Sequence, residues 1–174
     1  MANYRLSQLI DQILVLARAL PGHRAPDGTS STAGLVTVYD GPEIRSTDDA
    51  IDTTWLVIGW SGDDLDQLEE AATSTWTSGP IAAIVRPRDE TTTVNCKAVS
   101  QRAETMKAAR DGAVAEVEAV AQLCRNDPSL GIDTSATIGG VRTLAWVTAG
   151  SVVQYLDKGY VCEIDFTVSY NTRV

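Results

Sequence analysis

The alternation of apolar and polar residues is clearest near the C-terminal end of the chain. In CEIDFTVSYNTRV, residues 162–174, five apolar residues alternate with five polar ones from Cys162 to Asn171. A period of two is typical of a strand with one buried face. We therefore predict a strand here, paired antiparallel with the strand before it through a turn at residues 157–159 (DKG).

Apolar residues at helical spacing predict two further elements. The first is a helix over residues 6–20, which Pro21 and Gly22 terminate. The second is the longest helix of the chain, from about Arg102 to Arg125. One apolar stripe runs along it, with charged residues elsewhere on its surface; the stripe comprises Met106, Ala109, Ala113, Val117, Val120 and Cys124.

Three more segments carry strand patterns. Residues 35–42 (LVTVYDGP) are predicted to form a strand that ends in a turn. Residues 53–60 (TTWLVIGW) are apolar on both faces, as in a covered central strand. Residues 89–100 alternate in a way that predicts a strand with one covered side. Because 174 residues suit one hydrophobic core, we expect a single domain over residues 1–174.

The segment 23–34 (HRAPDGTSSTAG) has no periodicity and is rich in turn-forming residues, so it is predicted to be a long mobile loop. His23, the only histidine, falls at its start. A histidine without rigid support is a poor general base, so the sequence disfavours Ser-His-Asp and Cys-His catalysis. We expect no catalytic residues.

The net charge of −9 argues against a nucleic-acid-binding surface, because such surfaces neutralise phosphates with clustered Lys and Arg. It leaves open that DNA passes nearby without adhering. Asp11, Gln12 and Arg18 interrupt the apolar run near the N-terminus, so no signal peptide or membrane span is expected. The protein is expected in the cytosol of the cell that makes it.

The residues that could bind a metal lack the spacing that binding requires. Cys96, Cys124 and Cys162 are far apart and have no CxxC spacing, so we interpret them as buried, reduced core residues. The carboxylates between Asp63 and Glu70 fit the first turns of a helix over residues 61–72 better than a cation site. Gly139-Gly140 lacks the context of a phosphate-binding loop. We expect no metal and no cofactor.

Five segments together resemble a known family: VYDGPEI, VIGWSGDD, RDETTTVNCKAV, RNDPSLG and EIDFTVSYNTRV. Their order and spacing are similar to those of tail terminator (tail completion) proteins of long-tailed bacteriophages, especially phages of actinobacteria. The resemblance covers nearly the whole chain, although no single motif is diagnostic. The acidic SGDD and the segment TSTWTSG have no family role that we can assign.

The resemblance implies a structural virion protein without enzymatic activity. Its fold would be α/β (α+β), with a mixed, mostly antiparallel sheet covered on one side by helices including one long helix. Such proteins form a homo-oligomeric ring, expected to be a hexamer, on the head-proximal end of the tail tube. The ring ends tube polymerisation and provides the head-tail joining surface. Its expected partners are the tail tube protein below and a head-completion or connector protein above, with DNA passing through the lumen.

Other functions stay open. The nearest is another neck component, either a head-completion or a stopper protein. A second is a small acid-base enzyme that uses Asp and Glu. A third is a ligand-binding α/β domain, which only the two-sided apolar strand and the tryptophans favour.

Four residues are candidates for subunit or tube contacts. Thr172 and Arg173 end a strand that the core should hold in place, so the arginine would be presented at a fixed position and could bridge carboxylates across a ring seam. The alternative is that Arg173 pairs within its own chain. His23 and Arg24 belong to the predicted loop, which we expect to become ordered against a neighbouring subunit or the tube.

Overall fold

The structure is a computed structural model, and it describes residues 3–27, 34–41, 51–59, 72–78, 88–132 and 143–173. Within these ranges two helices and seven strands are defined. In chain order they are α1 (Asn3–Arg18), β1 (His23–Arg24), β2 (Val36–Asp40), β3 (Thr53–Ile58), β4 (Ala72–Ser78), β5 (Arg88–Arg102), α2 (Met106–Asn126), β6 (Thr143–Leu156) and β7 (Tyr160–Arg173).

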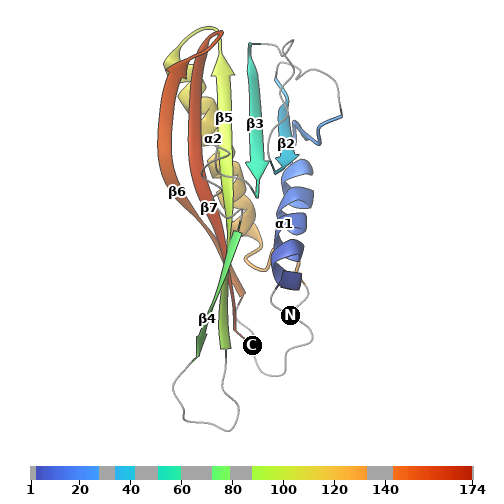
Figure 1. The fold of residues 1–174 in the computed structure, drawn as a ribbon. Coiled ribbons are helices and arrows are strands. Elements are labelled where there is room, and N and C mark those ends of the chain that lie inside the picture. Colours follow the sequence, from blue (N-terminus) through green and yellow to red (C-terminus); the bar gives the residue numbers. More distant parts are fainter. Residues whose placement is uncertain are drawn as a thin grey trace.

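All seven strands belong to one mixed sheet with the order β1-β2-β3-β5-β7-β6, and β4 pairs with the first part of β5 (Figure 1). The pairs β1–β2 and β2–β3 are parallel, whereas the others are antiparallel. The fold is therefore α+β with a mostly antiparallel sheet, as predicted. Figure 1 shows that β4 and the adjoining part of β5 extend beyond the ends of both helices.

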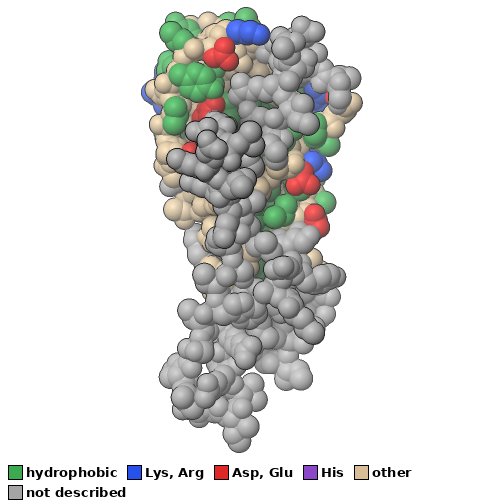
Figure 2. Space-filling view, in the orientation of Figure 1, with side chains coloured by type: hydrophobic (Ala, Val, Ile, Leu, Met, Phe, Trp, Pro, Cys, Tyr) green, Lys and Arg blue, Asp and Glu red, His purple; other side chains and the backbone are tan. Residues whose placement is uncertain are grey.

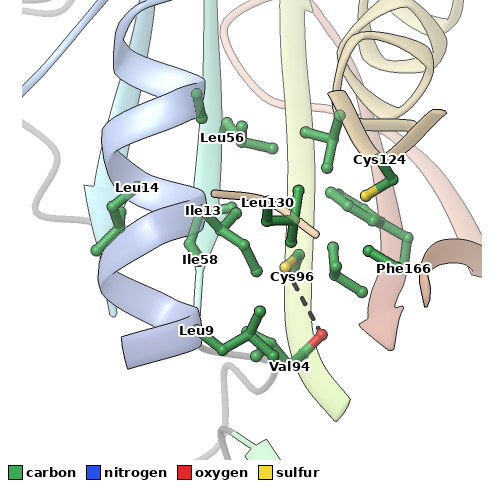
Figure 3. Close-up of a cluster of buried hydrophobic side chains, with 14 of the residues drawn as sticks. Leu9, Ile13, Leu14, Leu56, Ile58, Val94, Cys96, Cys124, Leu130 and Phe166 are labelled. Atoms are coloured by element: carbon green, nitrogen blue, oxygen red, sulfur yellow. Dashed lines mark hydrogen bonds between the residues drawn. The ribbon is translucent and has the colours of Figure 1, made fainter. Parts of the chain in front are cut away.

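Both helices pack on the same face of the sheet, where they form the main core. Leu9 and Ile13 of α1 belong to the same buried cluster as Val120 and Cys124 of α2, together with Phe166 of β7 (Figure 3). The small residues of α2 allow it to approach the sheet closely. A Cβ atom on Gly112 would lie 2.4 Å from the Ser100 Oγ atom of β5, which is closer than van der Waals contact allows.

The C-terminal hairpin confirms the prediction from the alternating pattern. Strand β7 buries Cys162, Ile164, Phe166, Val168 and Tyr170. Leu156 pairs with Tyr160 across the turn at residues 157–159, so β6 and β7 are antiparallel neighbours. The burial of the three cysteines is likewise confirmed, as is the covered strand β3, in which all six residues are buried.

Helix α2 begins later than predicted because β5 continues through Arg102. Thr105 caps the helix by accepting a hydrogen bond from the Ala108 amide at 3.1 Å. The prediction that β5 has one covered side is also wrong, because every residue from Cys96 to Gln101 is buried. The second covered face carries a separate apolar cluster that includes Trp55, Val57, Val99 and Val161.

Two further predictions need correction. The segment 23–34 does not start as a loop: His23 and Arg24 form β1 and pair with Val36 and Thr37 of β2. Strand β4 was not predicted at all, and Ala72, which we assigned to the end of a helix, is its first residue. The rest of that predicted helix and the Asp63–Glu70 carboxylates lie outside the described residues, as does Gly139-Gly140.

Candidate functional site

The structure separates the residues that the sequence singled out into two groups. His23 and Arg24 form the outermost strand at one edge of the sheet. Thr172 and Arg173 end β7, and strands β2, β3 and β5 lie between β1 and β7. The two groups therefore do not form one site, and each has to be considered separately.

Arg173 lies on an interior strand instead of at an edge. Strand β7 is paired on both sides, and the register places Arg173 opposite Asp89 of β5. Pairing of Arg173 within its own chain stays the alternative prediction. An interface role for Thr172 and Arg173 stays a prediction.

His23 connects β1 to helix α2. Its Nε2 atom lies 2.7 Å from Glu116 Oε2, and both side chains are largely buried, with 8% and 10% of their surface exposed. Its Nδ1 atom lies 3.1 Å from the carbonyl oxygen of Pro21. A carbonyl can only accept a hydrogen bond, so Nδ1 carries a proton. When the imidazole is protonated, it can donate from Nε2 to the Glu116 carboxylate as well and form a buried ion pair.

The hydrogen bond to Glu116 raises the pKa of His23 above its usual value, and it outweighs the opposing effect of burial. Because both ring nitrogens are occupied, neither is free to take a proton from a substrate. The pair is therefore a structural link between β1 and α2. Sequence reasoning missed Glu116, because its partner His23 is 93 residues away in the chain. A charged residue among the otherwise apolar buried positions of α2 is the signal that could have pointed to it.

A second polar cluster lies on the sheet face away from the helices. The Lys97 ammonium is 3.3 Å from Glu163 Oε2, and the Tyr155 hydroxyl donates a hydrogen bond to the other carboxylate oxygen of Glu163. In Figure 2, hydrophobic and charged side chains lie together on the upper part of this face. A lysine and a carboxylate that are buried together can have a structural or an acid-base role. Here Lys97 and Glu163 form an ion pair, in which each charge neutralises the other.

The two lateral edges of the sheet differ in how they are finished. At the first edge, β1 has two residues, and beyond it the Val38 carbonyl of β2 accepts hydrogen bonds from Arg18 Nε (3.3 Å) and Nη2 (3.2 Å). This edge is short and capped by a cation. Such features prevent a further strand from pairing with an edge.

Among the described strands, the opposite edge is formed by β6, which is long and uncharged. Strand β6 (TLAWVTAGSVVQYL) has 14 residues and contains neither a charged residue nor proline. It pairs only with β7 among the described strands. Val152, Val153 and Leu156 are exposed, Leu156 to 73%. A long, uncharged and exposed edge strand is a template for pairing with another chain.

Strand β4 forms a second uncharged edge. It has seven residues (ATSTWTS), also without charge or proline, and among the described strands it pairs only with β5. The interior strands carry the charges instead: β5 has Arg88, Asp89, Glu90, Lys97 and Arg102, and β7 has Glu163, Asp165 and Arg173. In a monomeric protein, charged residues are most useful on the edge strands of a sheet, because there they prevent pairing with another chain. We take the two uncharged edges as the candidate functional site.

The chain matches no family model, and no curated protein is significantly similar to it. Within the part of the chain that the structure describes, no helix is long and apolar enough to cross a membrane. In the same residues, no group of three or more His, Cys, Asp or Glu side chains could hold a metal ion.

Proposed function

We propose that this protein is a structural subunit of a long-tailed bacteriophage particle that assembles into a ring and terminates the tail tube. The observation that carries the proposal is the uncharged edge strand β6, which is 14 residues long in a chain of net charge −9. Copies of an acidic protein repel one another over most of their surface. An uncharged edge is where they can approach closely and exchange backbone hydrogen bonds.

The segments that carry the family resemblance lie on the elements that build this sheet. RDETTTVNCKAV lies on β5 and EIDFTVSYNTR lies on β7, and these two strands pair over 14 residue pairs. RNDPSLG leads out of α2. The family resemblance thus includes β5 and β7, the two strands that lie between β4 and β6.

Two observations favour this function over an acid-base enzyme. Both nitrogens of His23 are engaged in internal hydrogen bonds. The Lys97 and Glu163 charges are paired with each other in the sheet. A head-completion or stopper protein remains the closest second candidate, because it would also form a ring and would use the same kind of edge.

The proposal is tested by native mass and by capping of tail tubes. We expect the purified full chain to form a closed ring in native mass spectrometry. When it is added to polymerising tail tube protein of the same phage, negative-stain electron microscopy should show rings on one end of tubes that no longer elongate. A protein that stays monomeric over micromolar to millimolar concentrations contradicts the ring. Rings that bind a portal complex and leave tube growth unchanged identify the second candidate instead.

A further inference from the structure

The two uncharged edges bound the same section of the sheet. The pairing register runs across four strands from Trp76 of β4 through Glu90 and Thr172 to Thr143 of β6. It also runs from Ala72 through Val94 and Val168 to Val147. Residues 72–76 and 143–147 are therefore the left and right borders of one four-stranded section, β4-β5-β7-β6.

The directions of these strands alternate without exception. Strand β4 is antiparallel to β5, β5 to β7, and β7 to β6, so β4 and β6 run in opposite directions. Rotation about an axis roughly parallel to the strands preserves the direction of each strand. In a ring built by such rotations, β6 of one copy faces β4 of the next copy in antiparallel orientation.

We propose that neighbouring subunits join by pairing β6 (residues 143–149) of one copy with β4 (residues 72–78) of the next, so that the ring closes into a continuous antiparallel barrel. This inference rests on the proposed ring, and it names the contact that closes it. The occupant of each open edge is a second copy of this chain. Barrels of more than about 16 strands enclose an open channel, so a ring of several four-stranded sections has the lumen that DNA passage requires.

Pairing of β6 with β6 of another copy is the competing arrangement. It would also be antiparallel, but a two-fold axis closes after two copies and leaves the β4 edge uncovered. The β4–β6 contact covers both uncharged edges at once. It also agrees with the shape of β6: a bulge at Gly150 and Ser151 interrupts the register between Ala149 and Val152, and ends a regular segment equal in length to β4.

The β1–β2 edge is a poor partner for β6 of another copy. Strand β1 offers two residues, and Arg18 already occupies the Val38 carbonyl next to it. Strand β4 offers seven residues, of which residues 72–76 are level with residues 143–147 of β6. A partner edge of that length provides several backbone hydrogen bonds, each with a net worth of about 0.5–1.5 kcal/mol.

A charge exchange across the seam tests the pairing. In the register described above, Thr73 of β4 lies level with Trp146, so Thr148 of β6 is two residues further along the strand. Opposite charges at diagonal positions are about 7–8 Å apart and attract each other. We expect Thr73→Glu and Thr148→Lys each to weaken ring formation at least tenfold, and the double variant to restore it. The like-charged pair Thr73→Lys with Thr148→Lys should remain dissociated.

Ala115→Lys is the matched control, because it adds the same charge at an exposed position of α2. It should leave ring formation unchanged. Circular dichroism of every variant verifies folding, and hydrogen exchange of the unmodified protein gives a test without substitutions. Assembly should protect the amides of residues 72–78 and 143–149 together.

The outcomes separate the contact from the ring itself. Rings that persist in both single variants, or protection of only one of the two segments, overturn the β4–β6 pairing and leave the proposed function standing. Dimers as the largest species of the unmodified protein, dissociated by Thr148→Lys and left intact by Thr73→Glu, overturn it in favour of β6–β6 pairing. A monomeric unmodified protein overturns the proposed ring.

Discussion

The first and last edges of the sheet are built in opposite ways. At the β1–β2 edge, the chain uses a strand of two residues, a buried His23–Glu116 ion pair and an Arg18 cap on the Val38 carbonyl. At the β6 edge, 14 residues carry no charge and expose Leu156 and Val152. Charges thus secure one edge within the subunit, while the other edge is free of them. One sheet thus has a short, capped edge on one side and a long, uncharged edge on the other.

The largest expected effect comes from removing the ion pair at the closed edge. Glu116→Ala removes the partner of the buried His23 Nε2 atom, and breaking a buried ion pair by removing one partner costs about 3–5 kcal/mol. We expect chemical denaturation to show this loss in the free energy of unfolding. Glu118→Ala is the matched control on the same helix, where an exposed side chain should change stability by less than about 0.5 kcal/mol. Equal losses in both variants would mean that the pair does not secure the edge.

A smaller effect is expected from uncapping the Val38 carbonyl. Arg18→Met keeps the aliphatic length but removes both hydrogen bonds to this carbonyl, so we expect a loss of about 1–2 kcal/mol. Leu156→Gln at the open edge should change the unfolding free energy by less than about 0.5 kcal/mol, because Leu156 is 73% exposed. Denaturation of the dissociated subunit measures both. If Leu156→Gln lowered the free energy of unfolding as much as Arg18→Met, the two edges would not differ in their contribution to stability.

The smallest effect is a pH dependence confined to the closed edge. Because the pKa of His23 in the folded protein is above its unfolded value of about 6.5, the ion pair contributes its full stability below pH 6.5. That contribution is lost as the pH rises through the raised pKa. His23→Gln should therefore reduce the fall in melting temperature between pH 6 and pH 9. Identical pH profiles for His23→Gln and the unmodified protein would show that His23 is not the titrating group.

Part of the fold was predictable from local patterns. The alternation in β7, the hairpin at residues 157–159 and the apolar stripe of α2 were each confirmed, because side-chain periodicity records which face of an element is buried. Strand β4 was missed because ATSTWTS has neither alternation of apolar and polar residues nor a turn signal. The short strand β1 was missed because two residues cannot display a period.

The candidate site was less predictable than the fold. The sequence drew attention to Thr172 and Arg173 as a cation at a strand end, but not to the edges. Glu116 was not among the residues that the sequence pointed to, and only the packing of β1 against α2 gave it a partner 93 residues away. Polar residues that pair across the fold leave no local pattern, because their partners are distant in the chain.

By itself, the sequence determined that this chain forms one α+β domain, which strands and helices it contains in its more regular regions, and that β6 and β4 are uncharged. Only the tertiary structure decided that these two strands are the outer strands of one four-stranded section in the described sheet. The physical reason is that periodicity concerns side chains, which distinguish the two faces of a sheet. Lateral neighbours are joined by backbone N–H and C=O groups, which almost every residue has in the same form.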